Sequence, residues 1–220
     1  MNTVLTSVPT GPLAIVVDPG HGGEDGGTQG HDILEKNGTL EISLTLAREL
    51  RKRGHVVVMT REIDETVSLS ARRDLANAAR RHCFVSIHLN HGDARASGIE
   101  TFYGWPKRPE LVAALRTQYA VGTDAPFADE RGRLLAEAVQ KGALAATGAQ
   151  ERDIRNERQI LVLNSVHCPS VLVECGFVSN KSEAARLKTE AYRQKLASGI
   201  ADGIEQFLKE SASDPRYGIH

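Results

Sequence analysis

The sequence predicts an α/β protein with a single domain, in which helices flank a mostly parallel sheet. Short apolar runs rich in β-branched residues recur along the chain, and segments with helical periodicity separate several of them. Near-continuous apolar strands are typical of a sheet that is covered on both faces. The alternation of strands with helices favours parallel pairing. A chain of 220 residues is long enough for one sizeable domain of this kind and short for two.

The strand predictions rest on apolar runs that are too short for helices and are bounded by polar or turn-forming residues. The runs are residues 13–18, 56–60, 84–88, 99–103, 160–163 and 171–174.

The helix predictions rest on apolar residues that recur at the helical period. For the first helix, Asn37 or Thr39 is the expected start and Gly54 the expected end. The last helix has the strongest pattern. The predicted helices are residues 39–53, 68–81, 129–147 and 189–209.

The domain is expected to span residues 13–209. Residues 105–128 are punctuated by prolines and are interpreted as an excursion from this domain, in which residues 111–119 could form a short helix. Residues 1–12 are interpreted as a linker or a remnant of cloning, and residues 210–220 as a loose tail.

Composition excludes several classes of function. The chain has 40% apolar and 25% charged residues, a formal net charge of −1 and only 5% aromatic residues. Nothing in this balance favours a nucleic acid or an anionic membrane surface as a partner. No apolar run is long enough to cross a bilayer, and residues 1–12 lack the basic start and apolar centre of a secretory signal. We therefore expect no nucleic-acid partner and no membrane span. We also expect the protein to be a monomer.

The three cysteines, Cys83, Cys168 and Cys175, show no C-x-x-C spacing and are odd in number. A disulfide framework or a cysteine zinc site is therefore not expected. We interpret all three as small buried apolar residues.

Unusual residues lie where three of the predicted strands end. Residues 18–27 include five glycines and His21, residues 86–90 include His88 and Asn90, and Glu174 ends the last apolar run. Ligands of open α/β sheets bind beyond the carboxyl ends of the strands. These side chains are therefore the candidates for a functional site.

A zinc site is one outcome of this arrangement, since two histidines at the same sheet edge could converge. A lone histidine such as His21 is more often a surface or hydrogen-bonded residue. Two histidines with one carboxylate, however, form a known catalytic zinc set. From the residues alone the carboxylate could be Glu24, Asp25, Asp32 or Glu35. Glu35 could equally be a helix-start carboxylate, and Asp25 is the runner-up ligand.

Glu174 has two interpretations of similar weight. Beside a metal it would act as general base and then as general acid. Otherwise it could pair with one of the many arginines. Serine chemistry fits poorly, because no G-x-S-x-G turn is present.

Six blocks of the sequence together resemble the N-acetylmuramoyl-L-alanine amidase family 3 catalytic domain, from about residue 13 to residue 208. The blocks are residues 17–23, 34–37, 60–61, 69–72 with 76–77, 86–90 and 169–180.

The resemblance implies one catalytic Zn²⁺ held by His21, Glu35 and His88, with Glu174 as the catalytic glutamate. Asn90 would contact substrate or support a metal ligand. The sheet would be twisted, mostly parallel and six-stranded. The substrate would be peptidoglycan, cut at the amide between the lactyl group of N-acetylmuramic acid and L-alanine. The protein would then act in the periplasm or outside the cell.

Two departures from the family pattern affect these expectations. Many relatives have a basic residue where this chain has Asn164, so substrate positioning could differ there. Residues 105–128 form a longer excursion than compact members of the family have. Some relatives carry an inserted helix in this part of the chain that blocks the zinc until a regulatory partner protein removes it, and the excursion is short for such a helix. Two other functions compete with the amidase: a peptidoglycan-binding module without activity, and a zinc hydrolase of another amide. The intact set of four site residues argues against the first.

Overall fold

The computed structural model describes residues 14–77, 81–104, 129–156 and 160–213. The expected linker, the short helix at 111–119 and the part of the tail from residue 214 lie outside these residues.

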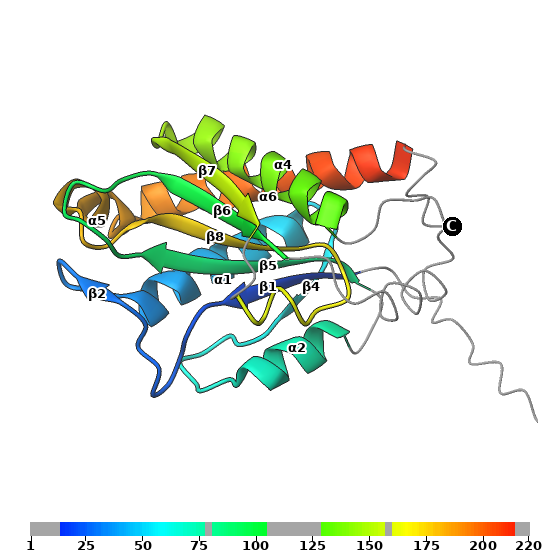
Figure 1. Cartoon of the computed structure of the whole chain (residues 1–220), viewed down its shortest axis with the longest axis horizontal. Helices are drawn as coiled ribbons and strands as arrows, with labels where there is room; N and C mark the ends of the chain where they lie inside the picture. The colour runs from blue at the N-terminus through cyan, green and yellow to red at the C-terminus, as the bar shows by residue number, and fades with distance from the viewer. Residues whose placement is uncertain (1–13, 78–80, 105–128, 157–159, 214–220) are drawn as a thin grey trace, which may run out of the picture.

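One six-stranded sheet forms the centre of the domain (Figure 1). Four neighbouring strands run parallel to one another. The remaining two strands are parallel to each other and antiparallel to these four. The predicted fold class and the mostly parallel six-stranded sheet are confirmed. In spatial order the strands are β4 (Val56–Met59), β1 (Ala14–Pro19), β5 (Arg81–Asn90), β8 (Ser170–Phe177), β6 (Ile99–Tyr103) and β7 (Glu151–Asn156).

Helices cover both faces of the sheet, as Figure 1 shows. One face packs against α1 (Glu35–Lys52), α4 (Asp129–Thr147) and α6 (Glu190–Ser213), and their apolar sides form the larger core. The opposite face packs against α2 (Leu69–Asn77) in a smaller core. The short helix α5 (Lys181–Leu187) follows β8.

Two strand assignments differ from the sequence prediction. Residues 160–163 form a turn, yet Val162 and Leu163 are buried in the smaller core. A short apolar run marks burial but does not separate a strand from a buried turn. The strand β7 was missed because it is charged: its exposure alternates along an edge of the sheet, and Ile154 is its single apolar residue.

Helix ends differ in several places. The first helix begins at Glu35, with Leu34 as N-cap and no side-chain cap, rather than at Asn37 or Thr39. Its predicted end is confirmed, because Gly54 has a φ of 90° and its N–H donates to the carbonyl of Arg51.

Further along the chain, Arg81 opens β5 instead of ending the second predicted helix. The last helix continues past Lys209 to Ser213, so the first residues of the expected tail are helical. The prediction also lacked α5 and a small hairpin formed by β2 (Gln29–Gly30) and β3 (Ile33–Leu34).

All three cysteines are buried, as predicted, and none of them forms a disulfide within the described residues. Burial raises the pKa of the Cys83 and Cys175 thiols far above its usual value, so neither thiol is suited to nucleophilic chemistry.

The helices α4 and α6 touch backbone to backbone through glycines. A Cβ at Gly203 would lie 2.4 Å from the carbonyl oxygen of Ala138, and a Cβ at Gly142 would lie 2.2 Å from that of Gly199. Any side chain here would force apart α4 and α6, two of the three helices that cover this face of the sheet.

We therefore expect Gly203→Val to lower the free energy of unfolding by about 1–3 kcal/mol through overpacking, although valine is the better helix former. Urea denaturation measures the change. Ala145→Val, at an exposed position of α4, is the control and should cost only about 0.5 kcal/mol. Equal losses for both variants would contradict the close helix contact.

Candidate metal centre and active site

The carboxyl ends of three neighbouring strands bring the sequence-predicted residues together. The central strand β5 lies between β1 and β8. His21 is in the loop after β1, and His88 lies near the end of β5. His88 and Glu174 are register partners on β5 and β8. The predicted convergence at this sheet edge is therefore present.

Three side chains form a group that could hold a metal ion: His21, Glu35 and His88 offer donor atoms that lie within 4.8 Å of one another. His21 Nε2 is 3.2 Å from Glu35 Oε2, and His88 Nδ1 is 3.0 Å from Glu35 Oε1. The two imidazole rings meet edge to face with centroids 4.9 Å apart. Two imidazoles and one carboxylate suit zinc, and three protein ligands leave one tetrahedral position open.

The Glu35 carboxylate is buried, with 2% of the residue exposed, and is held from both sides. Its Oε2 accepts the Thr28 N–H at 2.7 Å and its Oε1 accepts the Leu89 N–H at 3.0 Å. Burial alone would raise the pKa of Glu35, but hydrogen bonds from His21 and His88 outweigh it and hold that pKa well below its usual range. The hydrogen bond to Glu35 in turn raises the pKa of His21 to about 9 against the opposing effect of burial. The carboxylate is thus ionised and fixed in place.

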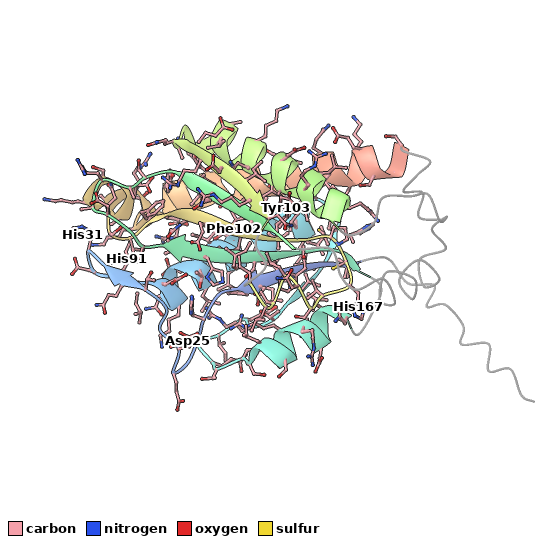
Figure 2. All side chains as sticks on the ribbon, in the orientation of Figure 1. Asp25, His31, His91, Phe102, Tyr103 and His167 are labelled. Atoms are coloured by element: carbon pink, nitrogen blue, oxygen red, sulfur yellow. The ribbon has the colours of Figure 1, made fainter. Side chains whose placement is uncertain are left out.

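The other three carboxylates considered from the sequence lie outside this group. Asp25 accepts a 2.9 Å hydrogen bond from His21 Nδ1, the ring nitrogen that does not face Glu35, and Figure 2 shows it on the loop after β1. The side chain of Asp32 is 94% exposed, and Glu24 is also exposed. Asp25 therefore orients a histidine instead of completing the group.

The glycine-rich loop is shaped by close contacts. A Cβ on Gly20 would lie 2.5 Å from Nε2 of His88, so only glycine lets the backbone pass this ring. His21 itself has a φ of 60°, a left-handed conformation that costs a non-glycine residue free energy. The surrounding structure must therefore hold the loop in this shape.

Arg61 provides part of that support. It is only 2% exposed, and its guanidinium donates to the carbonyls of Pro19 at 3.2 Å, Gly20 at 2.8 Å and Lys36 at 2.8 Å. The first two carbonyls belong to the loop that carries His21, and the third lies one residue after Glu35. Arg61 therefore ties together two segments that supply donor atoms to the group.

Arg72 supports the same loop from α2. Its Nη1 contacts the buried Asp18 carboxylate at 2.6 Å, and its Nη2 donates to the His21 carbonyl at 2.6 Å. Thr60 and Ser86 donate to the same carboxylate. From the sequence, Arg61 and Arg72 stood out only as parts of motifs, because no local pattern shows that a guanidinium is buried.

Glu174 lies beside the group on β8. Its Oε2 is buried without a hydrogen-bond partner among the described residues, and none of their arginines forms an ion pair with it. Burial, with the nearby carboxylates of Glu35 and Glu100, raises the pKa of Glu174 to about 7 despite the opposing effect of His88 and His21. A carboxyl group that titrates near neutrality is suited to proton transfer.

Sequence reasoning missed Glu100, which is 4% exposed and is the register partner of Glu174 on β6. The Nδ2 of Asn90 donates to its Oε2 at 3.4 Å. The available signal was a carboxylate inside the apolar run 99–103. Asn164, where many relatives have a basic residue, lies in the turn that follows residue 160 and donates to the carbonyl of Ile160.

Comparison with known proteins now identifies the family. The model of a family described as N-acetylmuramoyl-L-alanine amidase matches residues 15–206. The chain belongs to this family. A germination-specific N-acetylmuramoyl-L-alanine amidase of Bacillus subtilis is 32% identical over 225 residues, which cover 95% of this chain and 85% of that protein.

Solved structures show the same fold. The catalytic domain of CwlV, an amidase of Bacillus (Paenibacillus) polymyxa, is 31% identical with a TM-score of 0.73, over 90% of this chain and 98% of that one. The CwlD amidase of Clostridioides difficile, solved in complex with the GerS lipoprotein, is 27% identical with a TM-score of 0.77, over 90% and 99% of the two chains. This chain is thus a cell-wall amidase domain. Among its described residues, no helix is long and apolar enough to cross a membrane.

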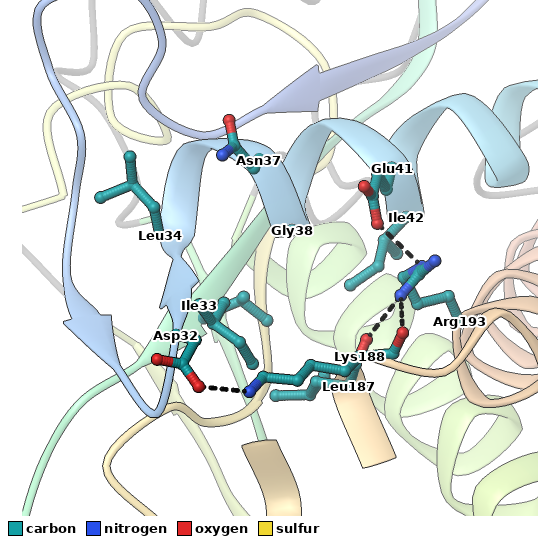
Figure 3. Close-up of a pocket in the computed structure, with 11 residues that line it drawn as sticks. Asp32, Ile33, Leu34, Asn37, Gly38, Glu41, Ile42, Leu187, Lys188 and Arg193 are labelled. Carbon is teal, nitrogen blue, oxygen red and sulfur yellow. Dashed lines mark hydrogen bonds and ion pairs between the residues drawn. The ribbon is translucent and has the colours of Figure 1, made fainter. Parts of the chain in front are cut away.

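A separate pocket of about 270 Å³ lies behind the start of α1 in this amidase (Figure 3). Asp32 pairs with Lys188 at 3.0 Å and Glu41 with Arg193 at 3.1 Å across it. His21, His88 and Glu174 are not among the described residues that line this pocket. The first ion pair joins the hairpin before Glu35 to the α5–α6 junction, and the second joins α1 to α6. The pocket therefore lies among contacts that hold the start of α1 in place.

We expect Arg61→Lys to lower the free energy of unfolding of the amidase by about 2–4 kcal/mol, because one ammonium cannot reach the separated carbonyls that the guanidinium satisfies. Urea denaturation of the metal-free protein measures this. The matched control is Arg51→Lys, whose side chain is 44% exposed and pairs with Glu62; it should change stability by less than about 0.5 kcal/mol. An Arg61→Lys variant with an unchanged free energy of unfolding would contradict the role of Arg61 in joining the His21 loop to the start of α1.

The pKa of Glu174 predicts a pH-dependent effect on stability. Its pKa is higher in the folded than in the unfolded protein. Ionisation of the buried carboxyl group therefore has no effect on the free energy of unfolding at low pH, and it lowers that free energy increasingly as the pH rises from about 4.5 to about 7. Glu174→Gln should therefore stabilise the metal-free amidase at pH 8 by up to about 3 kcal/mol and much less at pH 5. Denaturation at both pH values tests this, and a gain that is larger at pH 5 would contradict it.

Proposed function

We propose that this chain is a zinc-dependent N-acetylmuramoyl-L-alanine amidase that hydrolyses the amide between the lactyl group of N-acetylmuramic acid and L-alanine in peptidoglycan. His21, Glu35 and His88 would hold one Zn²⁺. The observation that carries the proposal is the convergence of these donor atoms within 4.8 Å, beside a carboxylate oxygen of Glu174 that has no hydrogen-bond partner in the described part of the chain. Membership of the amidase family supports the choice of this amide as the bond that is cut.

When bound, the ion would supply Lewis acidity toward the amide carbonyl and lower the pKa of the attacking water. Glu174 would take the proton of that water as general base. It would then pass the proton to the alanine nitrogen as the C–N bond breaks. A pKa near neutrality lets one carboxyl group perform both transfers.

The remaining residues would position these groups. The hydrogen bond from His21 Nδ1 to Asp25 leaves Nε2 facing Glu35, where it can coordinate the metal. Asn90 would act from outside the metal's coordination sphere or on substrate, since its amide already holds Glu100.

The cellular setting follows from the substrate. Peptidoglycan lies outside the cytoplasmic membrane, so we propose a periplasmic or extracellular site of action for a monomeric domain spanning residues 13–209. The CwlD neighbour was solved with a lipoprotein, and a regulatory partner protein is part of this proposal. The excursion at residues 105–128, outside the described residues, is the candidate segment for autoinhibition. Unchanged hydrolysis of sacculi after its deletion would exclude that role.

Two substitutions separate metal binding from catalysis. Glu174→Ala should retain one zinc per chain and lower turnover by at least about 100-fold, because general acid–base catalysis is lost. His88→Ala should weaken zinc binding by at least about 10-fold, because a ligand is removed. Metal analysis with chelator competition measures the zinc, and mass spectrometry of muropeptides measures the cleaved amide.

The control is His55→Ala, since His55 pairs with Glu205 away from the site; zinc content and turnover should be unchanged. Wild-type protein that binds no zinc, or that releases products without a new L-alanine amine, would contradict the proposal.

A further inference from the structure

Charge is distributed unequally on the two sides of the metal centre. On the side of β1 and β4, the loops that enclose His21 are acidic. Lys36 is committed there, because its Nζ donates to the Gly23 carbonyl and to Asp64, each at 2.7 Å. The exposed carboxylates of the loops after β1 and β4 are those of Glu24, Asp25, Glu62, Asp64 and Glu65.

The side of β6 and β7 carries charges of both signs, because Arg152 and Arg155 lie on it together with the carboxylates of Glu100, Glu151 and Asp153. Arg155 on β7 has a side chain that is 51% exposed and forms a 3.2 Å ion pair with the buried carboxylate of Glu100. Arg152 stacks over the Phe177 ring at 4.9 Å, and its Nε lies 3.8 Å from Glu100. Asp153 also contacts Arg155, at 2.9 Å. Two arginines are thus anchored around one buried carboxylate.

Strand register connects these arginines to the centre of the reaction. In the sheet order, β5, β8, β6 and β7 are successive neighbours. His88 pairs with Glu174, and Glu174 pairs with Glu100. Register partners point their side chains to the same face of a sheet. A substrate whose amide lies at Glu174 therefore has the acidic loops on one side and, past Glu100, the arginines on the other.

Because the half-exposed side chain of Arg155 lies against Glu100, the register partner of Glu174, we infer that Arg155, supported by Arg152 and Glu100, binds the free carboxylate of the acidic second residue of the stem peptide. The inference rests on the proposed function, whose substrate has an uncharged sugar on one side of the scissile amide and an anionic peptide on the other. The acidic loops repel the peptide and admit the sugar, whereas the guanidinium attracts the carboxylate.

Arginine suits this role because its planar guanidinium offers several N–H donors to a carboxylate. Half of the Arg155 side chain is accessible to solvent. The Glu100 side chain, which is 5% exposed, holds the Nε of Arg155 through the ion pair. The contact would select between stem peptides in which the second residue carries a carboxylate and those in which that group is an amide. It would act on substrate binding and leave the metal and Glu174 in place.

The test compares two N-acetylmuramoyl tripeptides that differ only in a D-glutamate or a D-isoglutamine as the second residue. The wild type should have a KM for the carboxylate substrate about 10-fold below that for the amide. Arg155→Gln should raise the KM for the carboxylate substrate about 10-fold, with kcat and zinc content unchanged, and should leave the amide substrate unaffected. Calorimetric binding of both substrates to Glu174→Ala and to the double variant Glu174→Ala/Arg155→Gln should show the same selective loss.

Arg133→Gln is the matched control, because Arg133 has a similarly exposed side chain on α4 and pairs with Glu137; it removes the same charge and should not alter the preference. An unchanged preference in Arg155→Gln, or an equal loss on both substrates, overturns the assignment while leaving the proposed function intact. Failure of the wild type to cleave either substrate contradicts the proposed function, and with it the proposed contact between Arg155 and the substrate carboxylate.

Discussion

The site depends on buried guanidinium groups that satisfy backbone carbonyls. A glycine-rich loop at a strand end has polar backbone groups that no sheet partner can bond, and such groups are costly to bury without a partner. Arg61 donates to the loop carbonyls and to the first turn of α1, while Arg72 is neutralised by Asp18 and donates to the loop from the other side. A strained loop and a helix start are thereby held as one unit.

Two carboxylates in this unit have opposite electrostatic surroundings. Hydrogen bonds from two imidazoles and two backbone N–H groups keep Glu35 ionised, as a ligand requires. Glu174 has a buried oxygen that finds no hydrogen-bond partner in the part of the chain that the structure describes, and its pKa is raised to about 7. The chemical roles proposed for the two residues follow from this difference in hydrogen bonding, since both are glutamates close to the same histidines.

How far the sequence could predict this arrangement depended on the kind of signal. The convergence of His21, His88 and Glu174 was predictable because they end strands of one parallel sheet, and strand ends meet at one edge. Glu35 could be chosen over Asp25 only by family resemblance. Its position depends on a hairpin of two-residue strands, which is too short to leave a periodic pattern.

The errors in the fold have a related cause. Apolar runs report burial, so the turn at residues 160–163 was taken for a strand, and the charged edge strand β7 was overlooked. Glu100 escaped notice because its importance arises from pairing across strands. That pairing required the antiparallel orientation of β6, which no local feature of the sequence reveals.

The reversed direction of β6 also determines where the domain can vary in length. Glu100, near the start of β6, lies beside Glu174, but Tyr103 at its end lies beside Val171, near the start of β8. The backbone therefore leaves β6 toward the opposite rim of the sheet before it enters residues 105–128. Insertions and deletions at that exit are separated from the reacting atoms by the length of a strand. A segment inserted at that exit would have to extend back over the length of a strand before it could cover the catalytic edge.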